Sequence, residues 1–261
     1  MIMASFNDFS TVIAQQSIEQ LLHTDALLLG SSDAISSYYC PFDAINTQAK
    51  VVLVGICPGK VQWKNALTSA RQALKAGLTL DQILLTAKTS GAFSGPMRSN
   101  LIHMLDYAGL AQKLDIQSTA ALFEPQNSLV HMTSVLRHCI LINGENYNGS
   151  SPNMLKNTFL NQHIQQYFIP ETAQFQNAVY IPLGKSVIDV LYHLSSLGYL
   201  KESQILDGFP HPSGANAERI KYFLGEKSAN QLSAKTNAQM IDQAKNRLLD
   251  KINHINFKAS T

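Results

Sequence analysis

Residues 51–59 read V-V-L-V-G-I-C-P-G, and this stretch decides the fold that we expect. Residues 51–55 form a short apolar run, mostly β-branched and closed by a glycine, which is typical of a strand buried on both faces. Pro58 and Gly59 then fix a tight turn after the strand. Open α/β sheets place their ligands at the carboxyl ends of such strands. The stretch therefore predicts a ligand-binding loop directly after a core strand.

A second fragment, residues 210–216, reads P-H-P-S-G-A-N and is the only other place where His, Ser, Pro and Gly stand so close together. His211 lies between two prolines, which hold it in extended geometry because each proline restrains the residue before it. That geometry suits the presentation of one imidazole nitrogen in a fixed direction. We expect this loop and the loop after residue 55 to face each other across one cleft.

The rest of the chain alternates between strand and helix patterns. Strands are predicted at residues 51–55, 129–135, 178–182 and 204–206. Helices are predicted at residues 6–29, 61–74, 79–88, 97–108, 154–168, 183–197, 217–224 and 238–255. Residues 30–37 fit a Ser-rich connector, and residues 143–152 fit a Gly/Asn-rich loop of functional length. The alternation predicts a three-layer α/β/α fold whose mostly parallel sheet has about four strands.

Three segments follow from these patterns. We expect an N-terminal helical extension over residues 1–45, one α/β domain over residues 46–226, and a C-terminal helix packed on the domain over residues 227–261. The chain has 261 residues, of which 45% are hydrophobic and 15% are charged, so it can bury a full core.

Charge and cysteine content exclude several classes of protein. Lys and Arg total 20 against 18 Asp and Glu, so the net charge of +2 does not by itself indicate a nucleic-acid binder. The three cysteines form no C-x-x-C pair, which indicates neither a disulfide framework nor a closed zinc site. We expect no metal, no cofactor and a reducing, cytoplasmic setting. No apolar run approaches the roughly 20 residues that span a bilayer, so we expect no membrane partner. We also expect the protein to be a monomer.

The order of these pieces resembles the uracil-DNA glycosylase superfamily. Its members carry a first motif, G-x-x-P-G or G-Q-D-P-Y, after the first core strand, and a last motif, H-P-S or N-P-S, near the end. Residues 55–59 (G-I-C-P-G) and residues 211–213 (H-P-S) match these two motifs. Residues 93–95 (F-S-G) resemble the F-x-G segment whose Phe stacks on uracil, and residues 183–185 (L-G-K) match a further L-G-x element. Residues 133–137 (T-S-V-L-R) resemble the strand end T-N-V-V-K of the thermophile-type, iron-sulfur branch.

Three departures from the family pattern concern its chemistry. Ile56 stands where the iron-sulfur branch has a Glu, and Cys57 stands where other branches have an Asn that positions the attacking water. Ser134 replaces the Asn that reads the edge of the base, and a hydroxyl lacks the paired donor and acceptor of an amide. Three cysteines cannot supply the four ligands of the iron-sulfur cluster.

The resemblance implies a monofunctional DNA glycosylase that hydrolyses the N-glycosidic bond of uracil or another damaged base, with DNA as its partner. The departing pyrimidine carries negative charge, and His211 is the candidate donor that stabilises this charge. The catalytic candidates are His211 and Cys57. The base-binding candidates are Gly55, Ile56, Pro58, Gly59, Phe93 and Ser134. The DNA-binding candidates are Lys60, Ser213, Gly214, Ala215 and Asn216, where a helix N-terminus follows.

Other roles remain open for these residues. Phe93 also fits a core aromatic, Lys60 a solvated surface charge, and Asn216 a plain helix N-cap. Cys57 also fits an inert buried thiol, because a reference pKa of about 8.5 makes cysteine a poor replacement for a carboxylate base. Two other functions also remain open: a catalytically impaired nucleic-acid-binding module of the same fold, and an enzyme that acts on free nucleosides or nucleotides.

Overall fold

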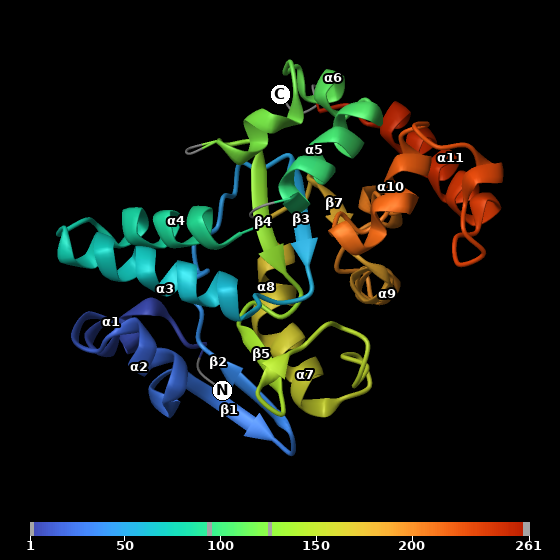
Figure 1. Ribbon diagram of the computed structural model, residues 1–261. Coiled ribbons are helices and arrows are strands. Elements are labelled where there is room, and N and C mark those ends of the chain that lie inside the picture. The colour runs from blue at the N-terminus through green and yellow to red at the C-terminus, as the bar shows by residue number, and fades with distance from the viewer. Residues whose placement is uncertain (1–2, 93–95, 125–126, 258–261) are drawn as a thin grey trace. The chain divides into compact units, whose positions relative to one another are not determined.

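The computed structural model describes residues 3–92, 96–124 and 127–257 (Figure 1). The chain divides into two compact units. The first unit comprises Met1–Thr47, Val54–Ala92 and Met132–Gln176, and the second comprises Gln48–Leu53, Phe93–His131 and Asn177–Thr261. These units do not follow the expected boundaries after residues 45 and 226. Strands β3 (Val51–Gly55) and β4 (Val130–Ser134) both begin in the second unit and end in the first.

The fold is of the α/β class, with a sheet of three parallel strands in the order β4-β3-β7. Strand β7 comprises Val179–Pro182, so the three longer predicted strands are confirmed. The predicted fourth strand is reduced to one parallel bridge between Ile205 and Tyr180, in which the Leu206 N–H donates to the Tyr180 carbonyl at 2.8 Å. The chain runs from β3 to β4 on one side and later to β7 on the other, so the strand order reverses at β3.

A second, antiparallel sheet lies in the first unit and was not expected. It has the order β1-β2-β5-β6, formed by β1 (Leu28–Ser32), β2 (Ile35–Tyr38), β5 (Cys139–Ile142) and β6 (Glu145–Asn146). The prediction of a connector at residues 30–37 is therefore wrong, and the N-terminal segment is not wholly helical. The segment predicted as a loop at residues 143–152 contains the two-residue strand β6 and is otherwise without regular structure. Asn143 and Gly144, with φ of 49° and 78°, form the tight turn between β5 and β6, because such turns need positive φ at both central residues.

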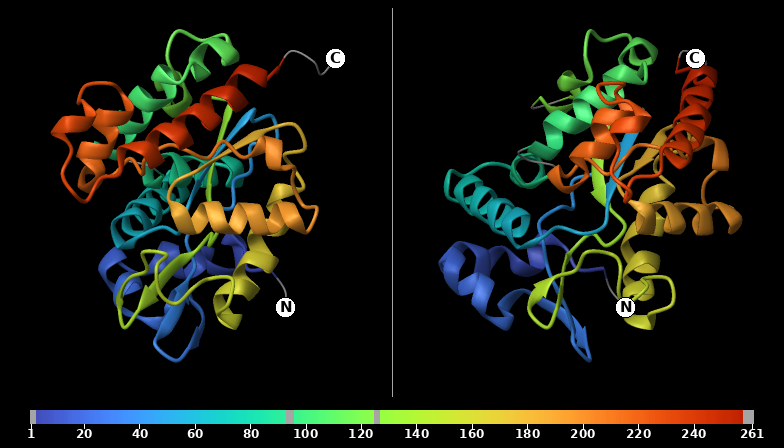
Figure 2. Two further views of the ribbon diagram at one scale, coloured as in Figure 1. Left: turned by 90° about the vertical axis from the view of Figure 1, so that its right-hand side faces the viewer. Right: turned by 45° about the vertical axis from the view of Figure 1, so that its right-hand side comes forward.

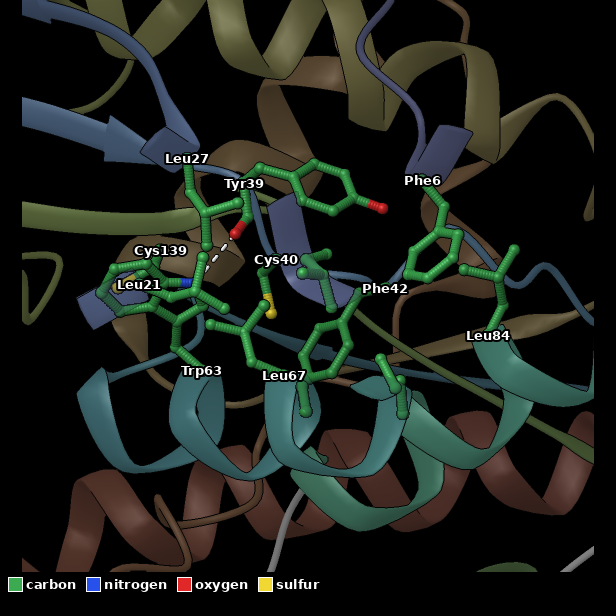
Figure 3. Packing of buried hydrophobic residues seen from close by; sticks show 14 of the residues in the cluster. Phe6, Leu21, Leu27, Tyr39, Cys40, Phe42, Trp63, Leu67, Leu84 and Cys139 are labelled. Atoms are coloured by element: carbon green, nitrogen blue, oxygen red, sulfur yellow. Dashed lines mark hydrogen bonds between the residues drawn. The ribbon is translucent and has the colours of Figure 1, made fainter. Parts of the chain in front are cut away.

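The helices of the first unit surround an apolar core. They are α1 (Phe6–Gln15), α2 (Ile18–His23), α3 (Lys60–Lys75), α4 (Leu80–Gly91), α7 (Thr158–His163) and α8 (Ile169–Thr172), with a π-helical turn at Ile164–Phe168. Figures 1 and 2 show α3 and α4 side by side. Figure 3 shows Trp63 of α3 among the core residues, where its Nε1–H donates to the Tyr39 carbonyl at 2.8 Å. The predicted helix at residues 154–168 begins later and continues further than expected.

The second unit contains five helices among its described residues: α5 (Pro96–Tyr107), α6 (Leu110–Leu114), α9 (Lys185–Ser196), α10 (Ala217–Phe223) and α11 (Ala238–His254). Leu101, Met104 and Leu105 of α5 are completely buried. The Lys251 ammonium of α11 donates to Asp207 at 2.8 Å and to the Ile205 carbonyl at 2.9 Å, which ties α11 to the chain after β7. Within the described part of the chain, no helix combines the length and apolarity needed to cross a membrane.

Short 3₁₀ turns complete the described structure. They lie at Asp25–Leu27, Thr119–Phe123, Glu202–Gln204, Gly214–Asn216 and Ala229–Gln231.

Candidate functional site

The loop after β3 lies beside the end of β4. The Gly55 carbonyl accepts from the Val135 N–H, and the Ile56 carbonyl accepts from the Leu136 N–H, both at 3.0 Å. Ser134 is the last residue of β4 and directly precedes these donors. The first motif and the segment expected to read the base edge are therefore adjacent within the first unit.

Cys57 is a protonated thiol that donates a hydrogen bond. Its Sγ lies 3.5 Å from the Tyr147 carbonyl oxygen. Burial raises the pKa of Cys57 to about 12, so the thiolate is scarce at neutral pH. Pro58, the next residue, is buried. The expected catalytic role of Cys57 therefore has no support from its protonation state, and the interpretation as an inert thiol fits better.

Two side chains accept hydrogen bonds from the main-chain N–H groups at the start of α3. The Gly59 N–H donates to Gln62 Oε1 and the Lys60 N–H donates to Asn146 Oδ1, both at 2.9 Å. Lys60 Nζ lies 3.8 Å from Glu145 Oε2, in a pair whose side chains are 45% and 85% exposed. The Lys60 ammonium thus already has a carboxylate neighbour, and its contact with DNA stays a prediction.

Two residues that follow β4 have structural partners. Arg137 Nη2 donates to Glu171 Oε2 at 2.6 Å and to the Tyr167 carbonyl at 3.1 Å. His138 Nδ1 accepts from the Cys40 N–H at 3.2 Å, and burial lowers the pKa of His138 well below 6.5. Among the described residues, no group of three or more His, Cys, Asp or Glu side chains is placed to hold a metal ion.

His211 is held as a neutral imidazole in the second unit. Its Nδ1 accepts from the Ser213 N–H at 3.2 Å, and burial lowers its pKa below 6.5. A neutral imidazole whose Nδ1 accepts a hydrogen bond carries its proton on Nε2. The remaining ring nitrogen of His211 is therefore a hydrogen-bond donor.

Two other segments fix the position of the His211 loop. A Cβ built on Gly184, whose φ is 109°, would lie 3.3 Å from His211 Cδ2, so the L-G-K element directly adjoins the imidazole. The Asn100 amide of α5 donates to the Pro212 carbonyl at 2.9 Å. The H-P-S and L-G-x motifs are separated in the sequence but are in contact within the second unit.

The residues after Ser213 form a polar chain rather than a simple cap. Asn216 Nδ2 donates to Ser213 Oγ at 3.0 Å, and Asn216 Oδ1 accepts from Arg219 Nη1 at 3.3 Å. Asn216 stands at the N-cap position of α10 but makes no side-chain cap bond there. The DNA contacts expected of Ser213, Gly214, Ala215 and Asn216 stay predictions. Phe93 lies outside the described residues.

Comparison with curated proteins finds a relative along most of the chain. The protein named "Uncharacterized protein YoxB" from Bacillus subtilis (strain 168) is 37% identical over 225 residues, which cover 85% of this chain and 88% of the relative. The chain belongs to the YoxB family. No protein-family model matches this YoxB-family chain, and no solved structure matches it.

The predicted site residues of the YoxB-family chain are divided between its two units. Gly55 to Lys60 and Ser134 belong to the first unit, and His211 to Asn216 belong to the second. Sequence reasoning missed Asn146, which caps α3, and Asn100, which holds the His211 loop. The sequence does contain a signal for the position of Asn146. The dipeptide Asn143-Gly144 is typical of a tight hairpin turn, and such a turn places Asn146 on the strand that follows it.

Proposed function

We propose that this YoxB-family chain is a monofunctional DNA glycosylase that hydrolyses the N-glycosidic bond of uracil or another damaged base in DNA. The observation that carries the proposal is the hydrogen bond inside the His211 loop, in which the Ser213 N–H donates to Nδ1 of the half-buried imidazole. The proton of the neutral ring is therefore on Nε2, which can donate to a ligand. Gly184 and Asn100 hold this loop in place. The ordered set of motifs supplies the reaction class.

The chemistry of base release explains why such a donor matters. When the bond between C1′ and the base nitrogen breaks, the electron pair leaves with the base and places negative charge on its ring oxygens. A preorganised donor aimed at this charge lowers the barrier, as an oxyanion hole does. A neutral His211 is suited to this role because burial disfavours its charged form. The base must also leave the duplex stack and enter a pocket that reads its edge.

The position of the first motif also supports the proposal. In open sheets with parallel strands, ligands bind beyond the carboxyl ends of strands at the point where the strand order reverses. In this chain the order reverses at β3, and residues 55–59 follow that strand. Residues 55–59 therefore lie where folds of this class bind ligands.

A base-release assay tests the proposal. Purified protein is incubated with single- and double-stranded oligonucleotides that contain uracil, hypoxanthine or xanthine, and abasic sites are cleaved and counted. His211→Ala should lower the rate about 10²- to 10³-fold, as expected for loss of one such donor. His193→Ala, at an exposed position of α9, is the matched control and should leave the rate unchanged. No release from any substrate, or equal rates for the two variants, would overturn the proposal.

A second candidate is a nucleic-acid-binding module that has lost catalysis. Ile56 is apolar, and Cys57 is a protonated thiol bonded to a main-chain carbonyl, so neither side chain of the first motif activates water. Binding to DNA that weakens with rising salt, without release of any base, would favour this module, because phosphate contacts make affinity depend on ionic strength. Calorimetric binding of free nucleotides without DNA binding would instead indicate an enzyme of nucleoside or nucleotide metabolism.

A further inference from the structure

The first motif needs a group to hold water, and a side chain from another segment lies directly against it. Asn146 of β6 contacts the first turn of α3: its Oδ1 accepts from the Lys60 N–H at 2.9 Å. A Cβ built on Gly59 would lie 3.5 Å from Cγ, Oδ1 and Nδ2 of Asn146, so the amide plane lies over the Gly59 main chain. Asn146 thus reaches the loop from 86 residues away in sequence.

The orientation of the Asn146 amide is fixed, and part of it remains available. Because Oδ1 faces the Lys60 N–H, the NH₂ group points elsewhere, and no described residue accepts a hydrogen bond from it. A carbonyl oxygen has two lone pairs, so Oδ1 can accept a second hydrogen bond from water. Asn146 is exposed, which leaves room for water and substrate beside it. The neighbouring Tyr147 carbonyl is already bonded to the Cys57 thiol.

We propose that Asn146 positions the attacking water in the base-release reaction, in place of the side chains that Ile56 and Cys57 do not supply. This inference rests on the proposed glycosylase function. The water is held by Oδ1, its oxygen bonds to C1′ as the base departs with the bonding electrons, and its proton passes to solvent while the base is protonated. Cleavage of such bonds passes through an oxocarbenium-like transition state. An amide suffices there, because an electron-deficient carbon needs an oriented water more than a strong base.

The contact with Lys60 has a purely structural explanation that the experiment must separate. Capping a helix N-terminus stabilises the fold by about 0.5–2 kcal/mol, and an Asn that only caps α3 would affect stability but not the chemical step. Asn146→Asp keeps an acceptor for the Lys60 N–H and suits the positive end of the helix dipole. It also introduces a titratable group at the position where the water is expected.

The test measures base release by the full chain as a function of pH for wild type, Asn146→Ala, Asn146→Asp and the control Asn148→Ala in the same loop. Asn146→Ala should lower kcat about 100-fold with little change in KM, the scale of a misplaced reacting group. Asn146→Asp should regain activity and acquire an acidic limb in its pH profile near the reference carboxyl pKa of about 4. Asn148→Ala should match wild type.

Each outcome supports or overturns the inference. If wild type releases base and Asn146→Ala matches Asn148→Ala, the water-positioning role is wrong while the proposed function stands. If Asn146→Asp restores activity with the wild-type pH profile, Asn146 only caps α3 and the role is again wrong. If wild type releases no base, the proposed function fails and this inference fails with it. Thermal melting of each variant identifies loss of folding, and if Asn146→Ala unfolds, the pH profile of Asn146→Asp decides.

Discussion

Replacing Glu171 by Ala should destabilise the first unit strongly, because it leaves the Arg137 charge buried without its carboxylate. The Arg137 Nη2 to Glu171 Oε2 distance is 2.6 Å, and the two side chains are 7% and 2% exposed. Arg137 stands in the T-S-V-L-R segment that resembles a base-reading strand end, yet its guanidinium pairs inside the unit. The prediction therefore also tests whether this residue belongs to the framework rather than to a DNA interface.

The expected loss of stability in Glu171→Ala depends on the contacts that Arg137 keeps in the variant. Removing one partner of a buried ion pair costs about 3–5 kcal/mol, since the remaining charge keeps its desolvation penalty. In the variant Arg137 still donates to the Tyr167 carbonyl at 3.1 Å and still lies 5.6 Å from the centroid of the Tyr167 ring. These contacts partly satisfy the guanidinium, so we expect a loss near the lower end, about 3 kcal/mol. Glu171→Gln should lose less, because it keeps an acceptor.

Urea unfolding followed by tryptophan fluorescence measures this loss. Trp63 is the only Trp of the chain, is 1% exposed, and belongs to the first unit, so its emission reports on the unit that contains the ion pair. Glu145→Ala is the control, because its side chain is 85% exposed beside Lys60, and such surface pairs contribute about 0–1 kcal/mol. If the midpoint of Glu171→Ala shifts no more than that of Glu145→Ala, the reasoning about buried charge is refuted.

Three further predictions concern other parts of the chain. Gly208→Ala should destabilise the second unit by about 2–5 kcal/mol in thermal or urea unfolding, because φ is 125° and a Cβ would lie 2.6 Å from the Ala244 carbonyl oxygen. The control Gly198→Ala should reduce the stability clearly less, because φ is 83° and a Cβ there would meet open space. Burial lowers the pKa of His163 from 6.5 to about 4. As the pH falls, the unfolded chain therefore binds a proton at this histidine at a higher pH than the folded chain does. Stability should therefore fall as pH drops from 6.5 toward 4, by about 3 kcal/mol, and His163→Phe should remove that part of the dependence in urea midpoints at pH 7 and pH 4. Cys57→Ala should leave base release unchanged, and Cys57 should react slowly with thiol reagents at pH 8, because its pKa is about 12; fast labelling there would contradict the assignment.

The parallel strands and most helices could be predicted because local sequence carries them. Residues 51–54 are continuously apolar and all buried, as a strand covered on both faces requires. At the start of α4, threonine is a favourable N-cap residue, and the Thr79 Oγ1 accepts from the Gln82 N–H. Such signals lie within a few residues of the element that they specify.

The antiparallel sheet was missed because its strands do not look like strands. Strands β1 and β2 read L-L-G-S-S and I-S-S-Y, and serine-rich runs resemble connectors. Their pairing comes from β5, about a hundred residues later, where Ile35 faces Ile142 and Tyr38 faces Cys139. Because β propensity depends on cross-strand partners, a strand of this kind is specified by tertiary contacts. Asn143-Gly144 gave the one local signal for the adjoining turn.

Sequence motifs could predict the loops of the candidate site, but not the side chains that contact those loops. Sequence order located the His211 loop and the first motif, whereas the groups that hold them come from distant segments. Asn100 bonds to the Pro212 carbonyl across 112 positions, and Asn146 bonds to the Lys60 N–H across 86. Single exposed or half-buried asparagines carry no local pattern that distinguishes them from surface residues.

Cys57 and Asn146 are linked by their geometry, and this link gives a last prediction. Cys57 donates to the carbonyl of Tyr147, the residue next to Asn146, so one segment occupies the Cys57 thiol and also brings the amide to Gly59. If the loop lacks only an oriented water, an amide supplied from position 57 should replace the one at position 146. Cys57→Asn in the Asn146→Ala background should therefore regain part of the base release that Asn146→Ala loses, with thermal melting as the check on folding. A folded double variant that stays at the Asn146→Ala rate would contradict the water-positioning role of Asn146.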